Sequence, residues 1–197
     1  MGKVVVSQFV TVDGVMEDPG GSEKWERGGW AFQFDRGPDG NQFKLDEVMA
    51  SDVLLLGRVT YQGFAEAWPP RTGEFADKYN TMPKYVVSTT LAEPEWNNTT
   101  VIGGDVAAEV AKLREQPGGD VLVNGSARLV TTLMEHDLVD AYRLMVFPVV
   151  LGAGKRLFAD GGPPATLRLA EARPVGSDGV LVLVYERAHG EAEAAAA

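Results

Sequence analysis

The chain has 197 residues, of which 45% are hydrophobic, so it is long enough to form one domain with a sizeable core. Its formal net charge of -10 opposes binding to nucleic acid or to an anionic membrane surface, and no run approaches the ~20 apolar residues that cross a bilayer. The absence of cysteine excludes disulfides and thiolate metal sites and fits a reducing cytoplasm, while only two histidines make a metal centre improbable.

The first half of the chain predicts two strands, with an ordered loop and a helix between them. A strand is expected at residues 3–10, ending at the turn signal Asp13-Gly14. Residues 17–42 are rich in glycine, proline and charge, but their aromatic side chains predict an ordered loop rather than a linker. A short helix follows at residues 43–50, and the apolar run at 52–57 is typical of a strand buried on both faces. The expected apolar face of the helix consists of Leu45, Val48 and Met49.

Strands and helices then alternate. Two further strands are predicted at 85–89 and 99–104, and Asp105 is a natural N-cap for a helix over 106–116. The pattern repeats with another strand and helix, with Ser126 as the expected N-cap of the second helix. The remaining predicted elements are the strand at 120–125, the helix at 126–136, the strand at 141–147, and a hairpin of residues 166–175 and 180–187.

This order of about eight strands and four helices predicts an α/β fold. The sheet should be mainly parallel with an antiparallel C-terminal hairpin, within one domain over residues 1–188. Residues 189–197 are expected to form a disordered tail. In sheets of this kind ligands lie beyond the carboxyl ends of the parallel strands, where the N-termini of helices point at them.

Small and hydroxyl-bearing residues mark three of these carboxyl ends, each expected to be a strand-to-helix corner, and two of the corners should open straight into a helix. Backbone N–H groups and helix N-termini favour an anion at such corners, and Arg58 could pair with a phosphate. For any one corner a plain capped turn is favoured, but all three on one sheet edge favour a phosphate-bearing cofactor. The corners are Gly57-Arg58-Val59-Thr60, Ser88-Thr89-Thr90 and Asn124-Gly125-Ser126-Ala127.

Other phosphate and acid motifs fail on inspection. The segment VVLGAGKR at 149–156 resembles a P-loop, but Val149 stands where its first glycine belongs and Arg156 replaces the hydroxyl residue that holds magnesium. Asp46 and Glu47 are adjacent on the predicted helix and so point apart, which favours a solvated helix face over a catalytic dyad.

The stretches LLLGRVTY, YVVST and VLVNGSARLVTTLMEHDLVDAYRLMVFPVVLGAGKRLF together resemble the dihydrofolate reductase superfamily. The closer resemblance is to the C-terminal reductase domain of the riboflavin-biosynthesis deaminase–reductase. It covers residues 3 to about 187, and the segment 121–158 is its most specific part. The resemblance implies a cytoplasmic homodimer that uses NADPH to reduce a small heterocyclic or imine/carbonyl substrate, as 5-amino-6-(5-phosphoribosylamino)uracil reductase does. A non-catalytic NADP-binding or dimeric interaction module on the same fold is the alternative.

The resemblance also implies which residues hold the cofactor NADP(H). The first corner matches the stretch that holds its phosphates, the second the strand end on the adenosine side, and the third the turn at the pyrophosphate. The implied cofactor-binding residues are Gly57, Arg58, Val59, Thr60, Ser88, Thr89, Asn124, Gly125, Ser126, Ala127 and Arg128.

The implied substrate pocket contains Phe9 as its floor, Asp13 beside the nicotinamide and Trp25 in a mobile loop that closes over the ring. Two positions depart from the family pattern. Asn124 precedes Gly125 where dihydrofolate reductases have a glycine pair, and Asn41 stands where they hold the carboxylate that binds the pteridine. Three carboxylates could replace it only with a shifted helix, so no catalytic proton donor is assigned and dihydrofolate is expected to be a poor substrate. They are Asp39, Asp46 and Glu47.

Overall fold

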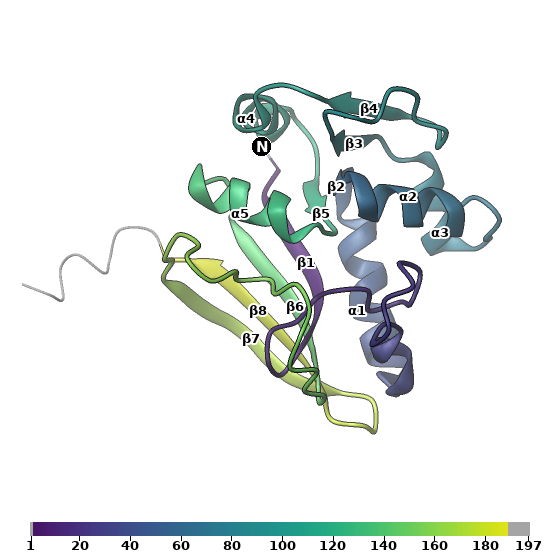
Figure 1. The fold of residues 1–197 in the computed structure, drawn as a ribbon, viewed down its shortest axis with the longest axis vertical. Helices are drawn as coiled ribbons and strands as arrows, with labels where there is room; N and C mark the ends of the chain where they lie inside the picture. Colours follow the sequence, from purple (N-terminus) through teal and green to yellow (C-terminus); the bar gives the residue numbers. More distant parts are fainter. Residues whose placement is uncertain (1, 189–197) are drawn as a thin grey trace, which may run out of the picture.

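An eight-stranded sheet runs through the structure, which is a computed structural model that describes residues 2–188 (Figure 1). The strand order across the sheet is β4-β3-β2-β5-β1-β6-β8-β7. The tail predicted at 189–197 lies outside the described residues. The strands are β1 (Val4–Thr11), β2 (Ser51–Gly57), β3 (Lys84–Val87), β4 (Thr99–Ile102), β5 (Asp120–Val123), β6 (Ala141–Phe147), β7 (Leu167–Val175) and β8 (Val180–Arg187).

The predicted mainly parallel sheet is confirmed. All pairings among β1 to β6 are parallel, whereas β8 pairs antiparallel with both β6 and β7. The apolar run of β2 is covered on both sides, since Leu54, Leu55 and Leu56 are completely buried. Because β3, β2, β5 and β1 are successive neighbours and run the same way, their carboxyl ends meet at one edge of the sheet.

Five α-helices are present where about four were predicted. The unpredicted one is α3, a helix of eight residues of which only Ala76 and Tyr79 are buried. The first helix begins at Gly37 rather than at residue 43, because Pro38 suits the first turn of a helix and the glycines there are tolerated. The helices are α1 (Gly37–Met49), α2 (Arg58–Ala67), α3 (Glu74–Thr81), α4 (Val106–Glu115) and α5 (Ala127–Glu135), with a 3-10 helix at Trp30–Gln33.

The helices cover the two faces of the sheet. Side chains of α4 and α5 pack against one face, as in the contact of Val110 and Leu133 with the buried valines of β1 and β5. On the other face, α1, α2 and α3 pack over β2, β3 and β5 (Figure 1). A separate aromatic cluster covers β6 and β8. None of the described helices is long and apolar enough to cross a membrane.

The loop before α1 is ordered, as its aromatic residues predicted. Trp30 is buried, and its indole N–H donates to the carbonyl oxygen of Glu17 at 2.9 Å. Its ring meets Phe147 edge to face with centroids 5.4 Å apart, and Phe34 packs against the same ring. This segment is therefore part of the core over β6.

The predicted apolar face of α1 is wrong in part. Val48 is buried, but Leu45 is only partly buried and Met49 is 44% exposed. Glu47, expected on a solvated face, is 2% exposed and faces the sheet beside Lys44. Charged residues occupy this inner face because they pair with each other and with Ser7 of β1.

Candidate functional site

The corners that follow β2 and β5 touch each other. The N–H of Gly57 donates to the carbonyl oxygen of Gly125 at 3.3 Å. A Cβ atom added at Gly57 would lie 2.3 Å from the hydroxyl oxygen of Ser126, and one added at Gly125 would lie 2.5 Å from that of Thr60. Glycine at both positions thus lets two strand ends and the helices that follow them meet without intervening side chains.

The helices α2 and α5 begin side by side at this contact, which confirms that two of the predicted corners open directly into helices. Their N-cap residues, Gly57 and Ser126, make no side-chain capping hydrogen bond, so the N–H groups of both first turns remain available. Two helix N-termini with free N–H groups and positive dipole ends form a cradle that suits a phosphate.

Two arginines flank this cradle, in the first turns of α2 and α5. Arg58 is exposed, and its guanidinium donates to the Gln62 side chain at 3.1 Å. Arg128 is also exposed, and within residues 2–188 neither arginine forms an ion pair. The N-terminal residues of α2 also include exposed Val59 and half-buried Thr60, and Ala127 opens α5. The cradle is locally cationic despite the negative net charge of the chain.

The third predicted corner lies on the same edge but differs in form. Ser88 is buried, and its hydroxyl oxygen accepts hydrogen bonds from the N–H groups of Thr90 and Leu91 at 3.1 and 2.9 Å. This serine therefore stabilises its own turn, and no helix follows directly. Thr89 and Thr90 are the exposed hydroxyl residues of this corner.

Asn124 turns inward from the corner. Its amide nitrogen donates to the carbonyl oxygen of Ser7 at 3.1 Å, and its amide oxygen accepts from the Tyr79 hydroxyl at 2.9 Å. Burial, together with the charge of Glu47, raises the pKa of Tyr79, so the phenol remains a donor. Asn124 thus joins β5 to β1 and α3, and the peptide bond between Gly125 and Ser126 is cis.

At the end of β1, Phe9 lies between aromatic and cationic groups. Its ring meets Phe147 edge to face at 5.2 Å, and the charged ends of Arg36 and Lys44 each lie 5.3 Å from its centroid. Phe9 is partly buried and joins the aromatic cluster. The predicted floor residue is therefore held firmly, with two cations beside it.

Asp13 links the turn after β1 to the loop at residues 151–152 by hydrogen bonds. Its carboxylate accepts from the Thr11 hydroxyl at 2.5 Å and from the N–H groups of Leu151 and Gly152 at 3.3 and 2.8 Å. The hydrogen bond from Thr11, together with those from the two N–H groups, holds the pKa of Asp13 below its ordinary value. This carboxylate is therefore ionised at neutral pH.

Trp25 packs on a neighbouring loop. Its backbone N–H donates to the buried carboxylate of Asp18 at 3.0 Å. A Cβ atom added at Gly154 would lie 2.7 Å from the indole ring. Residues 17–34, which include the loop expected to close over the nicotinamide, thus rest against the segment around Gly154.

The sequence did not identify a buried polar cluster of Ser7, Lys44 and Glu47. One carboxylate oxygen of Glu47 accepts from the Ser7 hydroxyl at 2.9 Å and lies 2.5 Å from the Lys44 ammonium, which also donates to Ser7. Its other oxygen has no partner among the described residues. The i,i+3 spacing of Lys44 and Glu47 was the available signal.

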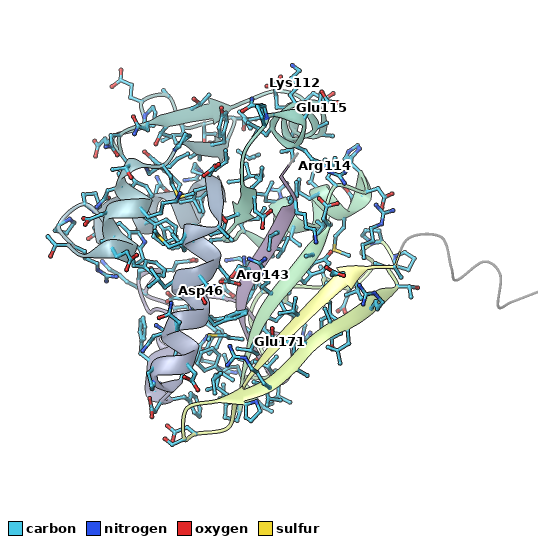
Figure 2. The ribbon with its side chains drawn as sticks, turned by 180° about the vertical axis from the view of Figure 1, so that it is seen from behind. Asp46, Lys112, Arg114, Glu115, Arg143 and Glu171 are labelled. Carbon is cyan, nitrogen blue, oxygen red and sulfur yellow. The ribbon has the colours of Figure 1, made fainter. Side chains whose placement is uncertain are left out.

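The other candidate acids of α1 lie outside this cluster. Asp39 and Asp46 are exposed. Asp46, which Figure 2 labels on α1, accepts from the Gln42 amide at 2.7 Å. Asn41, at the position of the missing carboxylate, accepts from the Arg36 guanidinium at 2.7 Å. The helix position at which dihydrofolate reductases have a carboxylate therefore holds an amide, and this amide contacts the Arg36 cation.

A cavity of about 310 Å³ lies elsewhere, between α5 and the segment 158–167. Its walls include Met134, Phe158 and Pro163, and none of its lining residues is titratable. It opens on the α5 side of the sheet, apart from Phe9 and the joined corners. The Thr131 hydroxyl is the one polar side chain in its lining.

The model of the RibD C-terminal domain matches residues 2–181. The uncharacterized protein YyaP of Bacillus subtilis (strain 168) is 31% identical over 188 residues, which covers 93% of this chain and 94% of that protein. Solved structures of other proteins share the fold. A putative riboflavin biosynthesis protein from Shewanella sp. PV-4 has a TM-score of 0.72 at 20% identity, covering 96% of this chain and all of the other.

The second solved structure is the diaminohydroxyphosphoribosylaminopyrimidine deaminase/5-amino-6-(5-phosphoribosylamino)uracil reductase of Thermotoga maritima. It has a TM-score of 0.60 at 15% identity, and the match covers 95% of this chain but 57% of that longer protein. These likenesses confirm the predicted dihydrofolate reductase-like fold.

Proposed function

This chain belongs to the RibD C-terminal domain family, and we propose that it is an NADPH-dependent reductase of a small heterocyclic or imine/carbonyl substrate. The proposed activity is similar to the uracil reductase activity named for the Thermotoga maritima protein. Family membership supports a reductase of the riboflavin-pathway type, and the geometry of the sheet edge supports the choice of cofactor.

The observation that carries the proposal is the contact between the corners after β2 and β5. Two uncapped helix N-termini begin there, and glycines exclude side chains from the space between them. A dinucleotide's pyrophosphate needs both features, because its oxygens are bound by backbone N–H groups at close approach. In the proposed arrangement, residues 57–60 and 125–128 hold the phosphates and Thr89 lies on the adenosine side.

Arg58 and Arg128 add permanent positive charge to this edge. The guanidinium is a planar fork of donors that matches a phosphate, which is why we assign the 2′-phosphate of NADPH to Arg58. Arg58 gives up one neutral hydrogen bond to Gln62 in doing so. This assignment favours NADPH over NADH.

The remaining residues shape the place where hydride transfer would occur. When bound, the reduced nicotinamide supplies the hydride. Phe9, held edge to face by Phe147, forms an apolar floor, and the loop that carries Trp25 closes one side against Gly154. These groups exclude water and orient the ring, while Asp13 fixes the loop at residues 151–152.

Steady-state oxidation of NADPH, followed by absorbance, tests the proposal against a panel of oxo-pyrimidines, pterins and cyclic imines. We expect turnover with at least one oxo-pyrimidine or imine, and NADH should support a lower kcat/KM. Dihydrofolate should fall below the ordinary enzyme range of about 10⁴ M⁻¹s⁻¹. Stable binding of NADPH without turnover of any compound would favour the non-catalytic module instead.

A further inference from the structure

The substrate end of the proposed site carries an arginine without a counter-charge. Arg36 lies just before α1, and its guanidinium is 5.3 Å from the Phe9 ring and donates to Asn41. It is half-buried, and burial lowers its pKa. Within residues 2–188, no carboxylate lies within ion-pair distance of this group.

The carboxylates that the sequence offered for this end either have other partners or are exposed on α1. Glu47 pairs with Lys44 and Ser7, and Asp13 binds the loop at residues 151–152. Asp39 and Asp46 are exposed on α1. The surroundings of Phe9 therefore present donors and positive charge, with Lys44 neutralised by Glu47 and Arg36 left over.

A nearby cation shows the contrast. Lys155, in the loop beside Trp25, forms an ion pair with Glu17 and lies 4.0 Å from Glu23. Arg36 has an amide as its partner instead. A partly desolvated charge without a counter-ion is costly, and an anionic ligand would remove that cost. A guanidinium fork is suited to planar carboxylate or phosphate oxygens.

Building on the proposed reductase function, we propose that Arg36 binds an anionic oxygen group on a planar heterocyclic substrate. The guanidinium would then select a ring edge that carries oxygen acceptors and negative charge. Folate-type recognition requires the opposite arrangement, since a carboxylate there pairs with donors of the ring. Asn41, at the carboxylate's position, serves to orient Arg36 through its side-chain oxygen.

The test compares three small-ring probes by isothermal titration calorimetry, each with and without NADP⁺. Orotate carries a carboxylate on a dioxopyrimidine ring, 6-methyluracil has the same ring without the charge, and 2,4-diaminopyrimidine presents a donor edge. We expect orotate to bind at least tenfold more tightly than either of the others. Equal affinities, or no binding of orotate to the wild-type protein, would overturn the proposal.

Substitutions of Arg36 test whether this residue causes the preference for orotate. Arg36→Gln should remove the preference for orotate and leave 6-methyluracil binding unchanged, while Arg36→Lys, which keeps the charge but loses the fork, should retain part of it. Arg71→Gln is the matched control, because Arg71 is exposed and stacks on Trp68 at 4.8 Å. Retention of the full preference in Arg36→Gln contradicts the proposal.

The outcome is separable from that of the proposed function. Arg36 is not among the residues assigned to the nucleotide, so Arg36→Gln should bind NADPH as the wild-type protein does, which also shows that it is folded. Failure of wild-type protein to bind NADPH would contradict the reductase proposal, whereas failure with orotate alone would contradict only the role of Arg36.

Discussion

Arg58 is the side chain that we expect to distinguish NADPH from NADH. Its guanidinium is exposed at the first turn of α2 and makes one neutral hydrogen bond. Arg58→Ala should weaken NADPH binding by roughly 1.5–3 kcal/mol, the range for a hydrogen bond to a charged group, and should barely change NADH binding. Titration calorimetry with both nucleotides measures this. Equal losses would move Arg58 to the pyrophosphate, and no loss for either would make it a surface residue.

Lys84 should make stability depend on pH. It is completely buried at the start of β3, where its ammonium donates to the carbonyl oxygens of Asn80, Met82 and Asn97. Burial lowers its pKa to about 8. Between pH 8 and the ordinary lysine pKa near 10.4, the unfolded chain binds more protons than the folded protein, so the free energy of unfolding should rise with pH.

The rise is at most about 1.4 kcal/mol per pH unit for one proton. Urea titrations between pH 7 and 9.5 measure this rise in the free energy of unfolding. Burial raises the pKa of Tyr142 to about 12, so the ionisation of this tyrosine affects stability only at higher pH. Lys84→Met should flatten the curve, because methionine fills a similar volume without titrating. An identical slope in both proteins would show that Lys84 remains protonated throughout.

At the scale of elements, the contact between the β2 and β5 corners decides whether the cradle forms. Gly125 has a positive φ of 67° and no space for a Cβ beside Thr60. Gly125→Ala should therefore lower the free energy of unfolding by more than the roughly 1–2 kcal/mol that a left-handed residue costs.

Gly152→Ala is the matched control in denaturation experiments. Gly152 has a φ of 71° but nothing within 4 Å of the position of an added Cβ. It therefore carries the same backbone cost without the steric clash. Equal destabilisation by the two substitutions would contradict the close contact between the corners.

The sequence predicted the elements whose pattern is strong and local. The continuous apolar run of β2 required burial on both faces, and Asp105 caps α4 through the Ala108 N–H at 3.0 Å as expected. The helix α3 was not predicted, because its contact with the core depends mainly on Tyr79 and neighbouring aromatic rings. A tertiary cluster of this kind has no local periodicity.

Only the parts of the candidate site that carry a recognisable local sequence pattern were predictable. Glycine and hydroxyl residues after strands identified the corners, but their mutual contact depends on β5 lying next to β2, which no local pattern indicates. The burial of Glu47 was missed for a related reason. Its partner Ser7 lies 40 residues away in β1, so adjacency to Asp46 alone suggested a solvated position.

At the scale of the whole molecule, we propose a homodimer that uses the face of β7 and β8 directed toward the α5 side. Leu169 and Leu181 are 51% and 40% exposed, and they share this face with Tyr185, whose ring packs against the core. Contiguous exposed apolar patches mark interaction surfaces, and pairing of this face with a second copy would cover both leucines. Light scattering after gel filtration should show a dimer, and Leu169→Glu with Leu181→Glu should shift it to monomer. A monomeric wild-type protein would contradict this.

Thermal stabilisation by NADPH tests the central claim, that the joined corners hold a phosphate-bearing nucleotide. At 100 times its dissociation constant, a ligand that binds only the folded state adds about 2.7 kcal/mol of stability, so Tm should rise measurably. We predict this rise for the wild-type protein, a smaller one with NADH, and none for Gly125→Val once circular dichroism shows that it is folded. An unchanged Tm at millimolar NADPH, or an equal rise in folded Gly125→Val, would contradict the account.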